Sequence, residues 1–139
     1  MIMEKKVIDA IIERAEDGTY DVYCIKEMFT GAGASVAEAK ADMMTQIEFF
    51  KATAKEEGLR YPDFLDGEFE MSYKYDIKSI LVYYVKNGIF SLSGLEKITG
   101  INQKQLWAYL NGTTPRKAQA ERIEKGLKNL AKDINAIFV

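Results

Sequence analysis

The chain has 139 residues, of which 47% are hydrophobic and 29% are charged, a globular composition with room for one ordinary core or two small ones. One cysteine and no histidine exclude an intramolecular disulfide, a cysteine-ligated zinc site and Ser-His-Asp or Cys-His catalysis. No apolar run is long enough to span a bilayer, and residues 1–10 lack the apolar run of a signal peptide. We therefore expect a soluble, cytoplasmic protein with no role at a membrane.

Charge is divided unevenly along the chain. Residues 1–75 carry nine Lys and Arg against sixteen Asp and Glu, a balance of −7, whereas residues 76–139 carry ten against five, a balance of +5. Because Lys and Arg neutralise nucleic-acid phosphates, this asymmetry predicts that only the C-terminal half meets a polyanion. We predict two domains, residues 1–75 and residues 76–139, with different tasks.

The first half is predicted to form three strands, a helix and a fourth strand. Apolar residues alternate over 7–15 and 19–25 around an Asp-Gly turn, which predicts a hairpin, and a short third strand covers 29–33. Ser35 and Glu38 have capping-box spacing, and apolar residues then recur at steps of three and four until Gly58. A loop over residues 59–67 leads to an alternating strand over residues 68–75. The predicted class is α+β, with a β-β-β-α-β domain followed by an all-α domain.

The second half is predicted to contain only helices. Polar residues suited to begin a helix are Asp76, Ser91, Asn102 and Thr114. Glycines suited to end the first three helices are Gly88, Gly100 and Gly112. Pro115 is predicted to be the first residue of the last helix, where its missing N–H has no cost. Gly126 interrupts the apolar face of that segment, so it forms either one long helix or two.

Residues 92–112 combine a turn glycine, an apolar residue, an N-cap and a helix that ends in Asn-Gly. Gly100 permits a tight turn, while Leu95, Ile101 and Leu106 hold two helices together and leave the second one projecting. This segment resembles the helix-turn-helix of the Cro and phage-repressor (XRE) family. The resemblance implies a DNA-binding domain, in agreement with the basic balance of this half; the alternative is an ordinary pair of helices in a bundle.

The same resemblance assigns residues to DNA. The residues assigned to base contacts are Gln103, Lys104, Ala108 and Trp107. Glutamine can pair with adenine, lysine can donate to guanine, and alanine can touch the thymine methyl group. The residues assigned to phosphates are Asn102, Asn111, Thr113, Arg116 and Lys117.

Two residues of this segment depart from the family pattern. Glu96 stands where the family usually has alanine, so we expect its charge to reach solvent and the angle between the helices to differ. Trp107 lies on the exposed side one turn after Gln103, where it either meets DNA or packs over the loops of its own domain.

Three segments of the first half carry a second resemblance. They are Asp-Gly-Thr-Tyr-Asp-Val-Tyr at 17–23, Phe-Thr-Gly-Ala-Gly at 29–33 and Ser-Val-Ala-Glu-Ala-Lys-Ala-Asp at 35–42. They resemble the HicB antitoxin family, in which a truncated ribonuclease H-like domain precedes a DNA-binding domain. Lys-Glu-Met at 26–28 replaces the usual Pro-Asp-Leu-Pro-Gly. The resemblance implies an antitoxin that neutralises a small basic ribonuclease toxin and represses the operon encoding both proteins.

Other functions remain open at this point. An orphan repressor of HicB-like fold would have no toxin partner, and a ligand-sensing regulator would bind a small molecule in its acidic domain. Asp9, Glu13 and Asp21 lie on or near adjacent predicted strands, as the metal-binding carboxylates of ribonuclease H do. The HicB group is regarded as having lost that set, so we predict no enzyme activity, no catalytic residues, no metal and no cofactor. Cys24 is predicted to be a small core residue.

A single helix-turn-helix offers few contacts, and relatives of this type pair two recognition helices on successive major grooves. We therefore predict a homodimer or a higher oligomer. The candidate surfaces are the edge of the N-terminal sheet and the apolar face of the last helix, which contains Leu127, Leu130, Ile134, Ile137 and Phe138.

Overall fold

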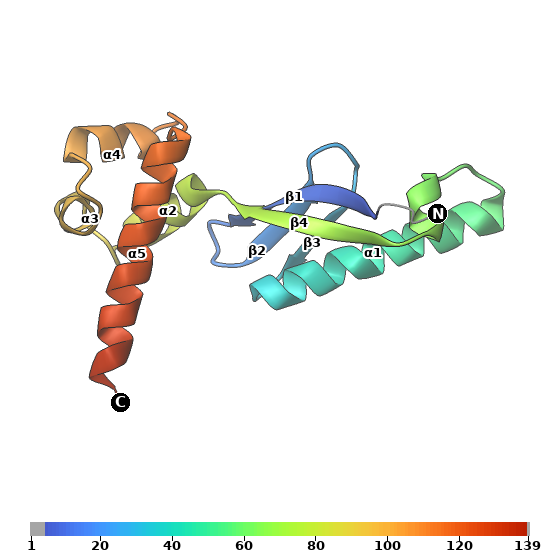
Figure 1. Ribbon diagram of the computed structural model, residues 1–139, viewed down its shortest axis with the longest axis horizontal. Helices are drawn as coiled ribbons and strands as arrows, with labels where there is room; N and C mark the ends of the chain where they lie inside the picture. The colour runs from blue at the N-terminus through green and yellow to red at the C-terminus, as the bar shows by residue number, and fades with distance from the viewer. Residues whose placement is uncertain (1–4, 139) are drawn as a thin grey trace. The chain divides into compact units, whose positions relative to one another are not determined.

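The computed structural model describes residues 5–138, and the contacts divide the chain into unit 1, Met1–Asp76, and unit 2, Ile77–Val139 (Figure 1). Within the described residues the fold contains one four-stranded mixed sheet and five α-helices. The predicted α+β class is confirmed. No helix in residues 5–138 is long and apolar enough to cross a membrane.

Unit 1 is a sheet packed on one long helix. Its elements are β1 (Lys6–Arg14), β2 (Tyr20–Cys24), β3 (Thr30–Gly33), α1 (Val36–Glu57), the short 3-10 turn η1 (Asp63–Asp66) and β4 (Phe69–Tyr75). The strand order is β3-β2-β1-β4; β1 pairs antiparallel with β2, as the hairpin pattern predicts, and parallel with β4. Residues 59–67, which are predicted to form a loop, contain the 3-10 turn η1.

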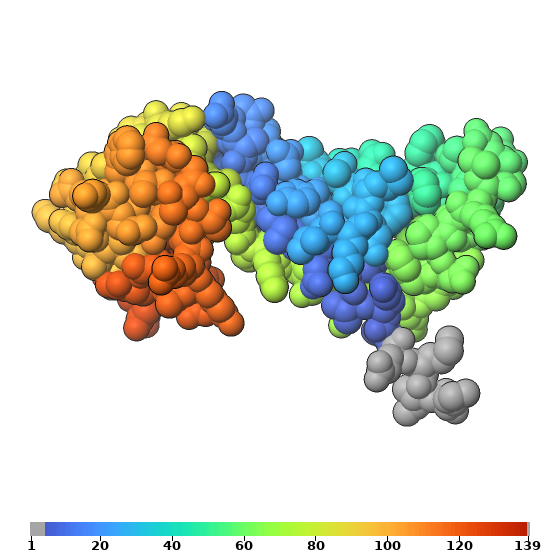
Figure 2. Space-filling model, turned by 90° about the horizontal axis from the view of Figure 1, so that it is seen from above, coloured from blue at the N-terminus to red at the C-terminus, as the bar shows by residue number. Residues whose placement is uncertain are grey.

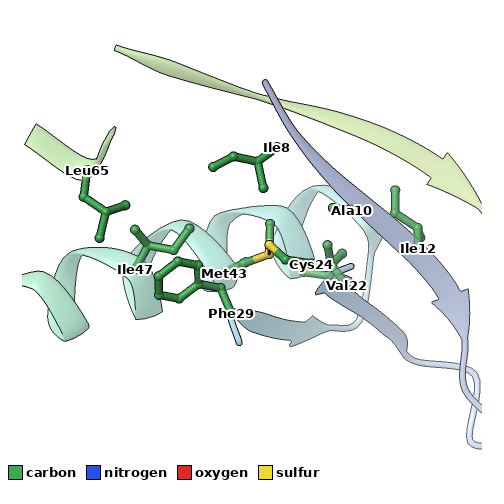
Figure 3. Close-up of a cluster of buried hydrophobic side chains, with 10 residues drawn as sticks. Ile8, Ala10, Ile12, Val22, Cys24, Phe29, Met43, Ile47 and Leu65 are labelled. Carbon is green, nitrogen blue, oxygen red and sulfur yellow. Dashed lines mark hydrogen bonds between the residues drawn. The ribbon is translucent and has the colours of Figure 1, made fainter. Parts of the chain in front are cut away.

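The core of unit 1 lies between α1 and one face of the sheet (Figure 3). Ile8, Ala10 and Ile12 alternate along β1, while Met43 and Ile47 face them from α1. The Ser35 hydroxyl accepts a hydrogen bond from the Glu38 N–H at 3.1 Å, so α1 begins at its predicted cap. The predicted apolar stripe of α1 therefore covers the sheet.

Gly31 and Gly33 allow β3 to lie directly against α1. A Cβ atom added to Gly31 would lie 2.5 Å from the carbonyl oxygen of Ala39, and one on Gly33 would lie 2.7 Å from the Ala39 nitrogen. These distances are too short for any side chain. The Gly-x-Gly sequence is therefore explained by packing between a strand and a helix.

Unit 2 consists of α2 (Ile77–Lys86), α3 (Leu92–Thr99), α4 (Gln103–Leu110) and α5 (Lys117–Ile137). Its separate core contains the buried residues Leu81, Leu95, Ile101, Leu106, Tyr109 and Ile123. Ser91 and Asn102 cap α3 and α4 as predicted, with their side chains accepting from the backbone N–H three residues later.

The predicted start of the last helix is wrong. α5 begins at Lys117, with Arg116 in the N-cap position, and Thr114 and Pro115 lie in the extended segment before it. The Thr113 N–H donates to the carbonyl oxygen of Ala108 at 3.0 Å, so Thr113 is still bonded to the last turn of α4. Residues 113–116 therefore form the connection that leaves α4, and the last helix begins only at Lys117.

α5 runs without a break through Gly126. A Cβ atom on this buried glycine would lie 2.4 Å from the carbonyl oxygen of Ile98 at the end of α3. The glycine thus lets two helices approach closely, and it does not divide the helix in two.

Candidate nucleic-acid interface

The turn between α3 and α4 is held by backbone and side-chain hydrogen bonds. The buried Thr99 hydroxyl donates to the Leu95 carbonyl oxygen at 2.7 Å and accepts from the Ile101 N–H at 3.1 Å. Gly100 follows at φ 73°, a left-handed conformation that favours glycine. The sequence pattern identifies Gly100 but not Thr99. The signal for Thr99 is a hydroxyl residue directly before the turn glycine.

α4 is anchored to unit 2 by one face. Its N-cap Asn102 accepts from the Gln105 N–H at 2.8 Å through Oδ1. Leu106 and Tyr109 are 0% and 2% exposed in the core of the unit. Because an α-helix repeats every 3.6 residues, the positions between these anchors point away from the core.

The exposed side of α4, here called the α4 outer face, consists of Gln103, Lys104, Trp107, Ala108 and Asn111. Ala108 is half-buried and the other four residues are exposed. Trp107 is 58% exposed, so the residue is not packed into the core of its own unit. The structure thus brings all four predicted base-contact residues to one face, and Figure 2 shows the orange segments that include α4 at the surface of unit 2.

Of the five residues assigned to phosphates, two make hydrogen bonds at the ends of α4. Asn102 is the N-cap, and the Asn111 side-chain amide donates to the Trp107 carbonyl oxygen at 2.8 Å. Thr113, Arg116 and Lys117 are exposed between the end of α4 and the first turn of α5. Arg116 and Lys117 therefore supply two exposed cations where α5 begins.

Glu96 of α3 makes an exposed hydrogen bond to the start of α4. Its side chain is half-buried, and its Oε2 accepts a hydrogen bond from the Gln103 N–H at 3.2 Å. A carboxylate is stabilised there because the first N–H groups of a helix lack partners within the helix and carry partial positive charge. Glu96 therefore ties α3 to the start of α4.

A further link, which sequence reasoning did not find, comes from α5. The Arg122 guanidinium donates to the Gly100 carbonyl oxygen at 3.0 Å and to Oε1 of Gln119 at 3.1 Å. Arg122 thereby holds the turn between α3 and α4 against α5. It also adds a positive charge near the N-terminal end of α4.

The carboxylates Asp9, Glu13 and Asp21 lie on β1 and β2. Glu13 and Asp21 face each other across β1 and β2, where Glu13 accepts from the Tyr23 hydroxyl at 3.2 Å. Asp9 lies four residues from Glu13 on β1, about 13 Å along an extended strand. Within residues 5–138 no three His, Cys, Asp or Glu side chains are grouped so as to hold a metal ion.

Cys24 is a core residue, as predicted. It is 6% exposed, and its Sγ lies 3.9 Å from the Met43 sulfur. Burial, with a smaller contribution from the charge of Glu27, raises the pKa of the thiol to about 11. The thiol is therefore protonated and unreactive at neutral pH.

An apolar groove of about 390 Å³ lies beside α1 in unit 1. Its exposed apolar lining residues include Met28, Phe49 and Leu59, with exposed fractions of 80%, 68% and 58%. This groove is the place where the ligand-sensing alternative would put an apolar small molecule.

Comparisons with protein-family models, with curated proteins and with solved structures find no match for this chain.

Proposed function

We propose that the chain is a sequence-specific DNA-binding transcriptional regulator, with α3 and α4 acting as a helix-turn-helix. The observation that carries the proposal is the α4 outer face, where Gln103 and Lys104 stand exposed on a helix whose opposite side is buried. An α-helix fits the major groove of B-DNA, where glutamine and lysine can recognise adenine and guanine.

The surroundings of α4 favour an anionic ligand. Arg116 and Lys117 are exposed at the start of α5, where they can contact phosphates on one side of the groove. Residues 76–139 have a balance of ten basic against five acidic residues. Glu96 of α3 is the acidic residue beside the first turn of α4, and its carboxylate accepts a hydrogen bond from the Gln103 N–H.

As the more specific function we propose an antitoxin that neutralises a small basic ribonuclease and represses its own operon. The supporting observation is the acidity of unit 1, whose sheet leaves one face free of α1. Asp9 and Asp21 are exposed on this face. A basic partner would complement them electrostatically.

DNA binding is tested by selecting fragments from the genomic DNA of the source cell with the full chain. We expect one sequence motif to be enriched, and binding to its site to weaken steeply with salt. In the same assay Lys104→Ala should lose the preference for the motif, whereas the control Lys132→Ala, far along α5, should keep it. Recovery of random fragments would refute a sequence-specific regulator.

The antitoxin function needs a separate test. The neighbouring genes should include a short reading frame for a basic ribonuclease, and its toxicity should be relieved when this chain is co-expressed. If the chain binds one DNA motif but no such neighbour exists, it is an orphan repressor. Relief of toxicity should also survive Lys104→Ala, because that residue lies in unit 2.

A further inference from the structure

The last part of α5 extends beyond the core of unit 2. Every residue over 131–138 is exposed, and Figure 1 shows these turns reaching past α3 and α4. Three large apolar side chains are among them: Ile134, Ile137 and Phe138 have exposed fractions of 46%, 74% and 80%. Such an uncovered group is typical of a surface that binds another protein.

The apolar residues of α5 have the spacing of a coiled coil. Ile123, Leu127, Leu130, Ile134 and Ile137 are separated by steps of four, three, four and three residues. This heptad spacing keeps one stripe facing a partner helix along its whole length. Ile123 is fully buried in the core of its own unit and Leu127 packs partly against that core, so the stripe begins in the core and becomes free of it toward the C-terminal end.

The charges of α5 leave this stripe free. Lys125, Lys128 and Lys132 fall at heptad positions on the opposite side of the helix, and Lys128 pairs with Glu124 at 2.9 Å. The residues that flank the exposed part of the stripe are Ala131, Asp133 and Phe138. Two copies can therefore bring their stripes together without facing lysines.

We propose that two copies of this chain pair through residues 127–138 of α5, side by side and parallel. The single flanking charge supports this orientation. An antiparallel pair centred on the same residues would place the two Asp133 carboxylates opposite each other, whereas a parallel pair places Asp133 opposite Phe138.

The parallel orientation also suits DNA, and this point rests on the proposed function. A twofold axis along the two α5 helices leaves both helix starts, with Arg116 and Lys117, at the same end of the pair. Two recognition helices at one end can meet successive major grooves of one duplex. The exposed ends of α5 then point away from the DNA.

The pair should be reversible. A stripe of two heptads is shorter than the surface of a permanent dimer, which buries at least about 1,200 Å². We expect a monomer-dimer equilibrium in the micromolar range. Two adjacent half-sites on DNA should favour the dimer further.

Sedimentation of the full chain tests the pairing. The wild-type chain should shift from monomer to dimer across the micromolar range, and Ile137→Asp should remain monomeric with an unchanged far-UV spectrum. Asn135→Asp is the matched control, because it adds the same charge on the opposite side of the helix and should dimerise normally. A monomeric wild-type chain, or equal behaviour of the two variants, would overturn the proposal.

Cysteine cross-linking tests the orientation. Ile137→Cys should give a disulfide-linked dimer on mild oxidation, because a parallel pair places the two copies of this position together. Asn135→Cys should not, and the native Cys24 is buried and does not compete. A dimer that fails to cross-link at position 137 refutes the parallel pair. A cross-linked dimer that binds no DNA motif would refute the proposed function and leave the pairing intact.

Discussion

Each unit buries its own hydrophobic core, but the two units use different elements to do so and carry different charges at their surfaces. In unit 1 a sheet lies on one helix, and in unit 2 four helices enclose a core; both use a glycine at the closest approach, Gly31 and Gly126. The surface of unit 1 is acidic, whereas unit 2 presents a helix with exposed glutamine, lysine and tryptophan. The two halves of this chain are thus distinguished by the side chains that each packed unit leaves at its surface.

The largest expected effect comes from separating the units. A fragment of residues 76–139 should keep salt-sensitive DNA binding, because it contains a complete core and the α4 outer face. A fragment of residues 1–76 should not bind. Mobility shifts at several salt concentrations measure both, with a slope of about 0.9 per phosphate contact in the logarithmic salt plot. DNA binding by the fragment of residues 1–76 would contradict the assignment of DNA binding to unit 2.

Core substitutions should separate stability from binding. Leu106→Ala and Ile8→Ala each remove a buried side chain, at a cost of about 2 to 5 kcal/mol in the unit that contains it. Leu106→Ala should also abolish DNA binding, because this residue anchors α4. Chemical denaturation measures the loss of stability in each variant, and mobility shifts should show intact DNA binding for Ile8→Ala, because α4 lies in unit 2. Equal loss of binding in both variants would mean that the units do not act separately.

The two close-approach glycines offer a finer comparison. Gly126→Ala brings a Cβ to 2.4 Å from the Ile98 carbonyl oxygen, and Gly31→Ala brings one to 2.5 Å from that of Ala39. We expect each to destabilise its own unit by about 1 to 3 kcal/mol, as overpacking does. Gly67→Ala, whose nearest neighbour would be 3.8 Å away, is the control and should change little. Thermal unfolding followed by near-UV absorption distinguishes them.

On the α4 outer face, base and phosphate contacts should respond differently. Gln103→Ala and Lys104→Ala should each cost about 1 to 3 kcal/mol on the preferred site and leave non-specific affinity nearly unchanged. Arg116→Ala should instead weaken binding to all sequences together. Competition with specific and random duplexes measures the difference. If Gln103→Ala and Lys104→Ala do not change binding, and substitutions in the strands abolish it, the sheet of unit 1 is the element that binds DNA.

The smallest effect concerns alkaline pH in unit 1. The pKa of Cys24 is raised from its ordinary value of 9.0 to about 11, so the folded state keeps a proton that the unfolded state loses. The free energy of unfolding of unit 1 should therefore be highest below pH 9 and should fall as the pH rises toward 11. Burial also raises the pKa of Tyr73, which adds to the same trend. Alkylation of Cys24 in the folded chain at pH 9 should be much slower than in the denatured chain; equal rates would contradict this.

The sequence by itself determined the features that depend on neighbouring residues. The hairpin around Gly18, the caps at Ser35, Ser91 and Asn102, and the apolar stripe of α1 follow from spacings of two to four residues. The exposed side of α4 followed in the same way, because a helix with known buried positions has a known opposite face. These local rules hold whatever else the chain touches.

Only the tertiary structure decided the features that join distant parts of the chain. The parallel pairing of β1 with β4, the role of Gly126 against Ile98, and the contact of Arg122 with Gly100 each connect residues more than twenty positions apart. The start of α5 at Lys117 also differs from the one that the local signals Thr114 and Pro115 predict, because the Thr113 N–H is bonded back to Ala108 of α4. Spacing within one element carries no information on which other element will lie against it, so such contacts are visible only once the chain has packed.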